Sequence, residues 1–437
     1  MRIMSKIFTN AQWIIVCRIV RALIQLVVGM LSARYLGPTN YGLVDYAAAI
    51  TAFALPVMQL GMDSVLVQEY LEHPDKNGQI MGTQLVMNLF SALVCMAGVT
   101  AFVAVANPGE TVTITVCVLY STSLLFQAVE MLQYWFQAKL LSKYSSMAML
   151  CAYLAVSAYK IYLLVSGKSV YWFALSHAVE YGATGILLLA AYHKVGQQKL
   201  HFSWSLMGKL FAKSKHYILA MLMVVVYNRV GSILITQMHG EQENGYYATA
   251  VACTCITGFV FTAIIDTARP VVLESRKRSQ EAFEKNVSRV YAMTTWLALA
   301  QSVGITLFAG LIIRILYGAD YLPAVPVLQI LIWNSAFSYM GYVRNIWILG
   351  EEKHSYLWII NLCGAVVSVV LNLGLIPIWG ACGAALASVL VQIFTNFIMG
   401  FLLKPIRQNN KLLLQGMNPK LLVELGKNLL ENRKETL

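Results

Sequence analysis

Residues 33–49 read ARYLGPTNYGLVDYAAA and place a sharp turn between two long apolar segments. Gly-Pro followed by Asn-Tyr-Gly is a turn signal, because glycine accepts a positive φ and proline cannot continue a helix. A gapless shift of 203 residues lays residues 36–49 of this stretch on HGEQENGYYATAVA at 239–252. The shift aligns Gly37 with Gly240, Gly42 with Gly245, Ala47 with Ala250 and Asp63 with Asp266. This pattern predicts a duplicated chain, in which each turn follows the first helix of one half.

The composition is that of a membrane protein. Of 437 residues, 58% are hydrophobic and 12% are charged, whereas a soluble domain has roughly 25% charged residues. Apolar runs of about 20 residues recur, each long enough to cross a bilayer as a helix. We therefore expect an all-α polytopic protein. Its twelve spans are expected near 13–35, 43–67, 81–106, 111–138, 143–166, 170–192, 216–238, 246–268, 288–316, 323–349, 356–378 and 381–403.

The basic residues predict the orientation of these spans. The first apolar run carries Arg18 and Arg21 and has no cleavage site, so it is a span and not a signal peptide. With a cytoplasmic N-terminus, about 24 of the 32 Lys and Arg residues lie on the cytoplasmic side, and only Arg34 and Lys168 lie in outer loops. Both termini are then cytoplasmic. The basic residues behind the net charge of +12 are distributed as in a membrane protein, so we expect no nucleic-acid partner.

The expected organisation is two six-helix lobes. Residues 1–192 form the N-lobe, 193–215 a cytoplasmic linker, 216–404 the C-lobe and 405–437 a basic cytoplasmic tail. The linker has an apolar stripe typical of an interfacial helix, although an ordinary basic connection fits it equally well; the stripe comprises Trp204, Leu206, Met207, Leu210 and Phe211. An even number of spans between the repeats gives them the same orientation, which favours alternating access around a midplane cavity.

Basic residues within the spans are candidates for binding an anion. A charge at this depth is costly and faces a cavity or a partner. Arg229 lies deep in the seventh span, Arg18 and Arg21 share a face of the first span, and Lys160 lies in the fifth. Because these four cations, with Arg344 as a further candidate, outnumber the deep carboxylates, the cavity is expected to favour phosphate. A structural ion pair, or snorkelling for Arg18, is the alternative.

Acidic residues in or near the spans are candidates for coupling or gating. Glu180 lies deep in the sixth span and fits either a coupling-proton site or the partner of a buried cation. Asp63, Asp266 and Glu130 lie near the cytoplasmic ends of their spans, where gating or structural pairing is expected. Asp45 lies near the outer turn and has Ala248 as its counterpart, so it is not part of the repeat.

Other polar groups fit sugar recognition, and none indicates a metal. Gln133, Gln137, Tyr134, Trp135 and Asn228 supply the hydrogen-bonding and stacking groups that sugars use, although aromatic residues are also routine at membrane interfaces. The eight cysteines lie in apolar runs, and the seven histidines have no ligand spacing. We expect no metal, no disulfide framework and no cofactor.

Four segments in order resemble one family. ARYLGPTNYGLVDYA, WFQAKLLSKY (135–144), LYGADYLPAVPVLQIL (316–331) and NLGLIPIWGACGAALASVL (372–390) are similar to segments of polysaccharide-biosynthesis membrane proteins. These are the Wzx-type flippases of the multidrug/oligosaccharidyl-lipid/polysaccharide exporter superfamily, and the resemblance extends from about residue 10 to 404. The last segment combines a tight turn with small residues that allow helices to pack closely.

The resemblance implies a V-shaped, alternating-access protein of the bacterial inner membrane. The implied activity moves an undecaprenyl-diphosphate-linked oligosaccharide, such as an O-antigen, capsule or exopolysaccharide repeat unit, from the cytoplasmic to the outer leaflet. Arg18, Arg21 and Arg229 match best the basic residues thought to meet the diphosphate. A polysaccharide polymerase and chain-length proteins are the implied protein partners. No catalytic residue is implied.

One departure from the family pattern leaves the coupling mechanism open. The family often has an acidic residue shortly after the position of Arg229, where this chain has Gly231. The sequence does not decide between coupling to a proton, to sodium and to the membrane potential. Glu180 is one candidate for the coupling residue. The alternatives to a flippase are a multidrug exporter of the same superfamily and a membrane-embedded polymerase or acyltransferase. An exporter of cations is expected to have acidic cavity residues, and a polymerase a large outer loop.

Overall fold

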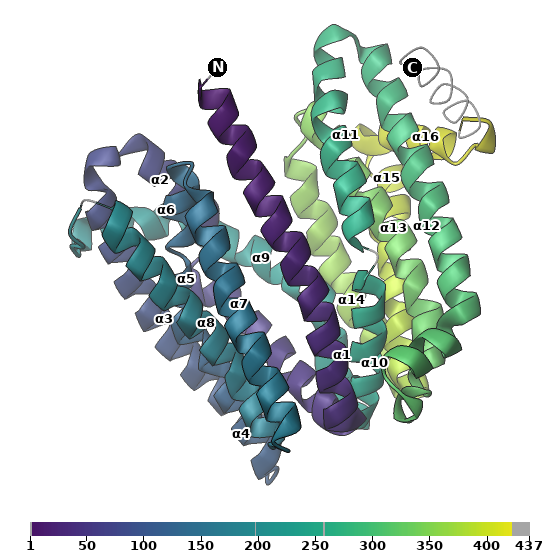
Figure 1. The fold of residues 1–437 in the computed structure, drawn as a ribbon. Helices are drawn as coiled ribbons and strands as arrows, with labels where there is room; N and C mark the ends of the chain where they lie inside the picture. The colour runs from purple at the N-terminus through teal and green to yellow at the C-terminus, as the bar shows by residue number, and fades with distance from the viewer. Residues whose placement is uncertain (1, 197, 257, 422–437) are drawn as a thin grey trace, which may run out of the picture. The chain divides into compact units, whose positions relative to one another are not determined.

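The computed structural model describes residues 2–196, 198–256 and 258–421, which form helices joined by short loops and no strand (Figure 1). The chain divides into two compact units, Met1–Gly245 and Tyr246–Leu437. The first unit contains α1 (Arg2–Met58), α2 (Asp63–Glu72), α3 (Asn77–Ala106), α4 (Thr111–Ser121), α5 (Ser123–Glu130), α6 (Gln133–Ala138), α7 (Ser142–Val165), α8 (Val170–Val195) and α9 (Trp204–His239).

Helix α10 (Glu241–Ile256) begins in the first unit and continues into the second. The remaining helices of the second unit are α11 (Gly258–Arg278), α12 (Gln280–Leu316), α13 (Ala324–Gly350), α14 (Ser355–Ile393), α15 (Met399–Leu402) and α16 (Arg407–Gly416). A π-helix, Phe394–Ile398, joins α14 to α15. The division of the chain into lobes, linker and tail stays a prediction.

The helices account for the twelve expected spans. Eight helical segments among the described residues, or nine with the bent pair α10 and α11, are long and apolar enough to cross a bilayer. Two of these segments contain a non-helical glycine, Gly37 in α1 and Gly380 in α14, and so supply two spans each. Helix α13, with 27 residues, completes the twelve. The expectation of an all-α polytopic membrane protein is confirmed.

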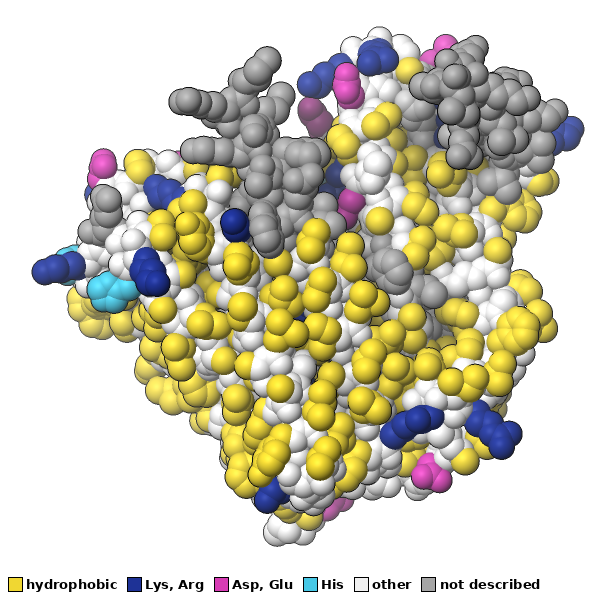
Figure 2. Space-filling view, viewed as in Figure 1, with side chains coloured by type: hydrophobic (Ala, Val, Ile, Leu, Met, Phe, Trp, Pro, Cys, Tyr) yellow, Lys and Arg dark blue, Asp and Glu magenta, His cyan; other side chains and the backbone are white. Residues whose placement is uncertain are grey.

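The surface agrees with this assignment. Hydrophobic side chains cover the middle of the visible face of each unit, and most of the charged side chains lie toward its ends (Figure 2). Large apolar residues such as Phe90, Val105 and Val165 are exposed. Such continuous apolar exposure is unfavourable in water and is expected where a helix meets lipid.

The turn at Gly37 and its predicted counterpart at Gly240 have the same backbone conformation. Gly37 has φ 70° and ψ 170°, and Gly240 has φ 88° and ψ 175°. Residues with a Cβ rarely adopt such angles, which is why glycine stands at both corners. Gly37 therefore bends the chain, as expected, and the common conformation supports the duplication.

Gly42 has a different role from the expected one. It lies within helical backbone and does not bend the chain, but a Cβ added to it would collide with the carbonyl oxygen of Glu241. In the same way, a Cβ added to Gly245 would collide with the carbonyl oxygen of Pro38. The shift of 203 residues relates Gly42 to Gly245 and Pro38 to Glu241, so the two contacts are equivalent by the repeat. Glycine is required here because the two hairpin corners pack backbone to backbone.

Hydrogen bonds reinforce this contact. The Nδ2 of Asn244, a fully buried residue, donates to the Gly42 carbonyl oxygen at 2.8 Å. The Tyr46 hydroxyl donates to Asn107 Oδ1 at 2.9 Å, and Gln237 on α9 donates to the same oxygen at 3.1 Å. Helix α9 is therefore tied to the α1 hairpin at the end of the unit that contains Gly37, which we call the Gly37 end.

The expected interfacial helix within 193–215 is not a separate element. Helix α8 runs to Val195, and α9 begins at Trp204 and continues through the seventh span to His239. The reason is that 204–239 contains no proline and only isolated glycines, so nothing breaks the helix between the stripe and the span. The residues of the stripe also differ in burial. Leu210 is fully buried in the core, whereas Trp204 is 74% exposed.

Replacing Gly42 or Gly245 with alanine is expected to destabilise the first unit. The added methyl group must displace backbone, which typically costs about 1–3 kcal/mol. Gly98→Ala is the matched control, because Gly98 lies in the helical interior of α3 with open space around its Cβ position. Helix propensity alone predicts that this control stabilises the protein by roughly 0.5–1 kcal/mol. The measurement is thermal unfolding of the purified protein in detergent, and equal melting temperatures for all three variants would contradict the close contact.

Candidate functional site

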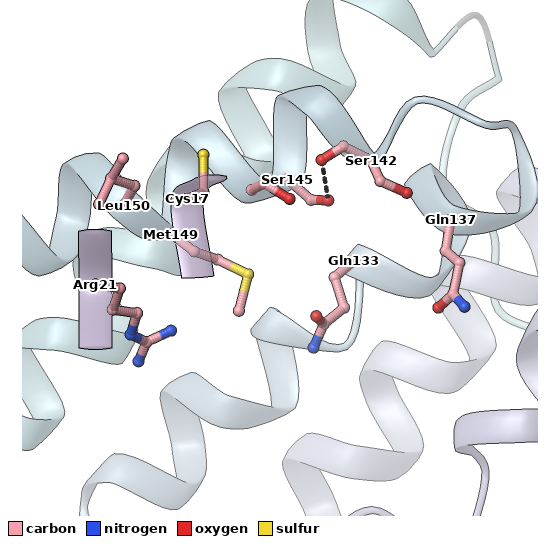
Figure 3. Close-up of a pocket in the computed structure, with 9 residues that line it drawn as sticks. Cys17, Arg21, Gln133, Gln137, Ser142, Ser145, Met149 and Leu150 are labelled. Atoms are coloured by element: carbon pink, nitrogen blue, oxygen red, sulfur yellow. Dashed lines mark hydrogen bonds between the residues drawn. The ribbon is translucent and has the colours of Figure 1, made fainter. Parts of the chain in front are cut away.

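A polar cavity of about 220 Å³ opens within the first unit, toward the end opposite Gly37, where α6 meets α7 (Figure 3). We call this the Lys139 end, after the residue that follows α6. Helices α1, α6 and α7 supply the cavity lining, which comprises Cys17, Arg21, Gln133, Gln137, Ser142, Ser145, Ser146, Met149 and Leu150. Six of these nine residues are polar, and polar side chains in a membrane-spanning bundle call for a functional explanation.

Local sequence places the neutral polar groups of this cavity. Helix α6 has only six residues, and Leu140, with φ 56°, turns the chain directly into α7. Ser142, Ser145 and Ser146 follow at the spacing that puts them on one face of α7. The Ser145 hydroxyl donates to the Ser142 carbonyl oxygen at 3.1 Å, which leaves its lone pairs available to a ligand.

Arg21 is the cation of the cavity, and it is held from two sides. Its Nη2 donates to Glu180 Oε1 on α8 at 2.7 Å, and its guanidinium carbon lies 5.1 Å from the centre of the Tyr153 ring on α7. The side chain of Arg21 is 30% exposed, but that of Glu180 is only 7% exposed. The carboxylate is thus enclosed, while the guanidinium keeps an open side toward the cavity.

Two further candidates surround this pair. Glu130 on α5 interacts electrostatically with both Arg21 and Glu180. Lys160 on α7 does the same from the Gly37 side, because it lies only five residues before the end of α7 at Val165. The structure therefore brings together four of the sequence-predicted charges, two basic and two acidic.

Arg229 and Asp45 form a second pair nearer the Gly37 end. Arg229 Nη1 lies 3.3 Å from Asp45 Oδ1, with the two side chains 39% and 18% exposed. Asn244 donates to the other carboxylate oxygen at 3.3 Å. Asp45 is therefore part of the contact between the α1 hairpin and α9, and it supplies an acid opposite Arg229, although the chain has glycine at position 231.

Tyr120 and His177 connect the two pairs. Their rings lie 4.5 Å apart, and Tyr120 interacts electrostatically with Arg229, Asp45 and Glu180. His177 interacts in turn with Lys160. A polar track thus extends through the first unit from the cavity to the Gly37 end.

The charges along this track balance in number. Arg21, Lys160 and Arg229 face Asp45, Glu130 and Glu180, so among these residues the expected excess of positive charge is not present. The other two expected cations are not among these residues. The side chain of Arg18 lies outside the described residues, and Arg344 lies in the second unit. Arg344 is buried and donates to the Thr395 carbonyl oxygen at 2.7 Å and to Asn396 Oδ1 at 2.8 Å, both on the π-helix.

The remaining candidates lie elsewhere. Asp63 begins α2, outside the spanning helices, where burial raises the pKa of its carboxyl group and the Tyr134 hydroxyl opposes that shift. Asp266 is exposed on α11 in the second unit. Neither residue lines the cavity, although Tyr134 interacts electrostatically with both Asp63 and Glu130.

Sequence reasoning missed several residues of the site. It did not single out the three serines, although their spacing after the short α6 segment is a usable signal. Tyr153 and His177 gave no signal, because a single aromatic residue or histidine in an apolar run is commonly structural. Their roles follow from which helices lie side by side.

The chain belongs to a family of polysaccharide biosynthesis proteins, whose model matches residues 31–326. An uncharacterised membrane protein of Methanocaldococcus jannaschii is 23% identical over 216 residues, a match that spans 49% of this chain and 42% of that protein. The chain thus spans less than half the length of that relative.

Solved structures show the fold in transporters. The lipid II flippase MurJ in an inward closed conformation has a TM-score of 0.72 at 15% identity, covering 94% of this chain and 91% of that chain. An inward-facing multidrug resistance MATE family transporter of the MOP superfamily has a TM-score of 0.65 at 14% identity, covering 91% and 96%. The chain is similar in fold to these transporters, and its expected membership of a polysaccharide biosynthesis family is confirmed.

The Asp45–Arg229 pair is expected to contribute to stability as a unit. Asp45→Asn and Arg229→Gln each leave one partly buried charge without its partner and are expected to lower the melting temperature. The double variant Asp45→Asn/Arg229→Gln removes both charges, so its loss is expected to be smaller than the sum of the single losses by roughly 1 kcal/mol. Thermal unfolding in detergent measures this cycle. Strictly additive losses would show that the two side chains are not coupled.

Proposed function

We propose that this protein is a flippase for a polyprenyl-diphosphate-linked oligosaccharide. The proposed substrate carries undecaprenyl diphosphate, and the proposed movement is from the cytoplasmic to the outer leaflet of a bacterial inner membrane, with both termini cytoplasmic. The basic loops support this orientation through the positive-inside rule. The proposed role is transport, so no catalytic residue is assigned.

The observation that carries the proposal is the open side of Arg21 in a cavity of amides and hydroxyls. A guanidinium forms paired, charge-assisted hydrogen bonds with phosphate oxygens, which suits a diphosphate. Gln133, Gln137 and the serines supply donors and acceptors of the kind that sugar hydroxyls use. Membership of a polysaccharide biosynthesis family supports the sugar-linked ligand over a plain phospholipid.

The route of the substrate follows from its chemistry. Its headgroup is too polar to cross lipid, whereas its polyprenyl tail is soluble there. The headgroup would enter at the Lys139 end, where the cavity opens and where the orientation places the cytoplasm. The polar track toward Lys160 and Arg229 would then offer further cations as the headgroup moves. Alternating access of the two repeats would expose it to the other side.

The second candidate function is an exporter of cationic drugs, favoured by the likeness to MATE transporters and by the balanced charges of the polar track. Glu130 and Glu180 are the carboxylates that a cation would use. Coupling to a proton, to sodium or to the membrane potential is compatible with either function. A polysaccharide polymerase and chain-length proteins stay proposed partners.

Replacing Arg21 with glutamine is expected to reduce flipping of an undecaprenyl-diphosphate-linked oligosaccharide in proteoliposomes by about thirty-fold. Loss of a hydrogen-bonded ionic contact costs roughly 2 kcal/mol, and each 1.4 kcal/mol is a factor of ten. Arg34→Gln is the matched control, because Arg34 is an exposed arginine of the same helix outside the cavity. Wild-type protein that moves cationic drugs but not the diphospho-lipid would replace the flippase proposal with the exporter.

Substrate is also expected to shield the cavity from chemical labelling. In a chain whose eight cysteines are replaced, Ser146→Cys places a thiol in the cavity, and Tyr144→Cys places one on an exposed position of the same helix outside it. The diphospho-lipid should slow maleimide labelling at position 146 by at least about five-fold, and at position 144 by less than about two-fold. Equal rates at position 146 with and without substrate would place the binding site elsewhere.

A further inference from the structure

Glu180 and a phosphate would share the charge of the same guanidinium, that of Arg21. Its Nη2 lies 2.7 Å from Glu180 Oε1, which is a full charge-assisted hydrogen bond. Arg21 also lines the cavity, and its side chain is 30% exposed. A diphosphate carries more negative charge than one carboxylate, so it competes for the same cation when it enters.

We propose that, without substrate, the Glu180 carboxylate occupies the position on Arg21 that the diphosphate takes, and that diphosphate binding displaces the carboxylate from the guanidinium. The proposal rests on the proposed function, and it adds a mechanism to the same site. Without substrate, the pair keeps an arginine neutralised within a membrane-spanning bundle, where an unpaired cation is costly.

The groups that face Glu180 allow it to be displaced. Besides Arg21, they are Tyr153 and Lys160 on α7, Glu130 on α5, Tyr120 on α4 and Tyr181 on its own helix. Only Lys160 among these five is a cation. The distance of each residue from the Gly37 end can be measured along its helix. Arg21 lies about 24 Å from the Gly37 turn, and Glu180 lies about 15 Å from the start of α8. Lys160 lies about 8 Å from the end of α7.

Glu180 is therefore flanked by a cation on each side. When the diphosphate takes Arg21, the carboxylate still faces Lys160 and is not left as an isolated buried charge. The occupancy of Arg21 is therefore a choice between Glu180 and the substrate.

The test measures binding of farnesyl diphosphate to the purified full-length protein in detergent by calorimetry, with farnesol as the ligand that lacks phosphate. Glu180→Gln keeps the shape but removes the competing charge, so we expect about ten-fold tighter binding. Arg21→Gln is expected to weaken binding at least about ten-fold. In the double variant, Glu180→Gln is expected to change affinity by less than about two-fold relative to Arg21→Gln, because the contested cation is absent.

Glu69→Gln is the matched control. Glu69 is also buried and paired with a cation, Lys213, but it lies on α2 outside the cavity. Its variant is expected to bind farnesyl diphosphate within about two-fold of the wild type. Glu180→Met, of similar length, replaces Glu180→Gln if the latter does not fold.

The outcomes separate this inference from the proposed function. If wild-type protein binds farnesyl diphosphate no better than farnesol, the proposed function fails. If the wild type binds but Glu180→Gln binds equally or more weakly, Glu180 positions Arg21 and the competition is overturned. Equal tightening in the Arg21→Gln background would show a general effect of charge, which also overturns it.

Discussion

The arrangement of this protein depends on the pairing of charged side chains inside a bundle that crosses the membrane. A single charged residue at the centre of a spanning helix costs about 2.5–3.5 kcal/mol on insertion scales, so charges within the spans are expected to be partners of one another. Arg21 with Glu180 and Arg229 with Asp45 satisfy this constraint at two levels of the first unit. Each pair joins helices distant in the sequence, so the pairing also determines which helices lie side by side.

The glycine contact at the Gly37 end complements this pairing. Because Gly42 and Gly245 let two backbones touch, the α1 hairpin and the start of α10 approach closely enough for Asn244 to reach both Gly42 and Asp45. The steric requirement is equivalent in the two repeats, but the charged pair is not, since position 248 is alanine where position 45 is aspartate. The duplication thus supplies the scaffold, and one repeat carries the ion pair.

Much of the fold was predictable from local sequence, and the reasons are physical. Long apolar runs must be helices in lipid, because no water is present to satisfy the backbone. Gly37 and Gly240 are recognisable as corners because their angles exclude other residues. The helix from Trp204 to His239 was not predicted as one element, since an amphipathic stripe followed by an apolar run fits one continuous helix as well as two. The sequence left undecided whether the stripe and the seventh span join into one helix. That depends on the packing of Leu210 against the core.

For the candidate site, too, one part was predictable from local sequence and another part depended on tertiary structure. The sequence by itself determined that this is a polytopic helical membrane protein with a repeat, that Arg21, Lys160, Arg229 and Glu180 lie within its spans, and that Asp45 and Glu130 lie nearer the ends of theirs, because hydropathy and residue type are local properties. Only the tertiary structure decided that these charges balance in the first unit, that Glu180 meets Arg21, and that Gln133 shares a cavity with the serines of α7. Such contacts join residues more than a hundred positions apart or on separate helices, and their geometry is determined by packing between helices and not by the sequence around each residue.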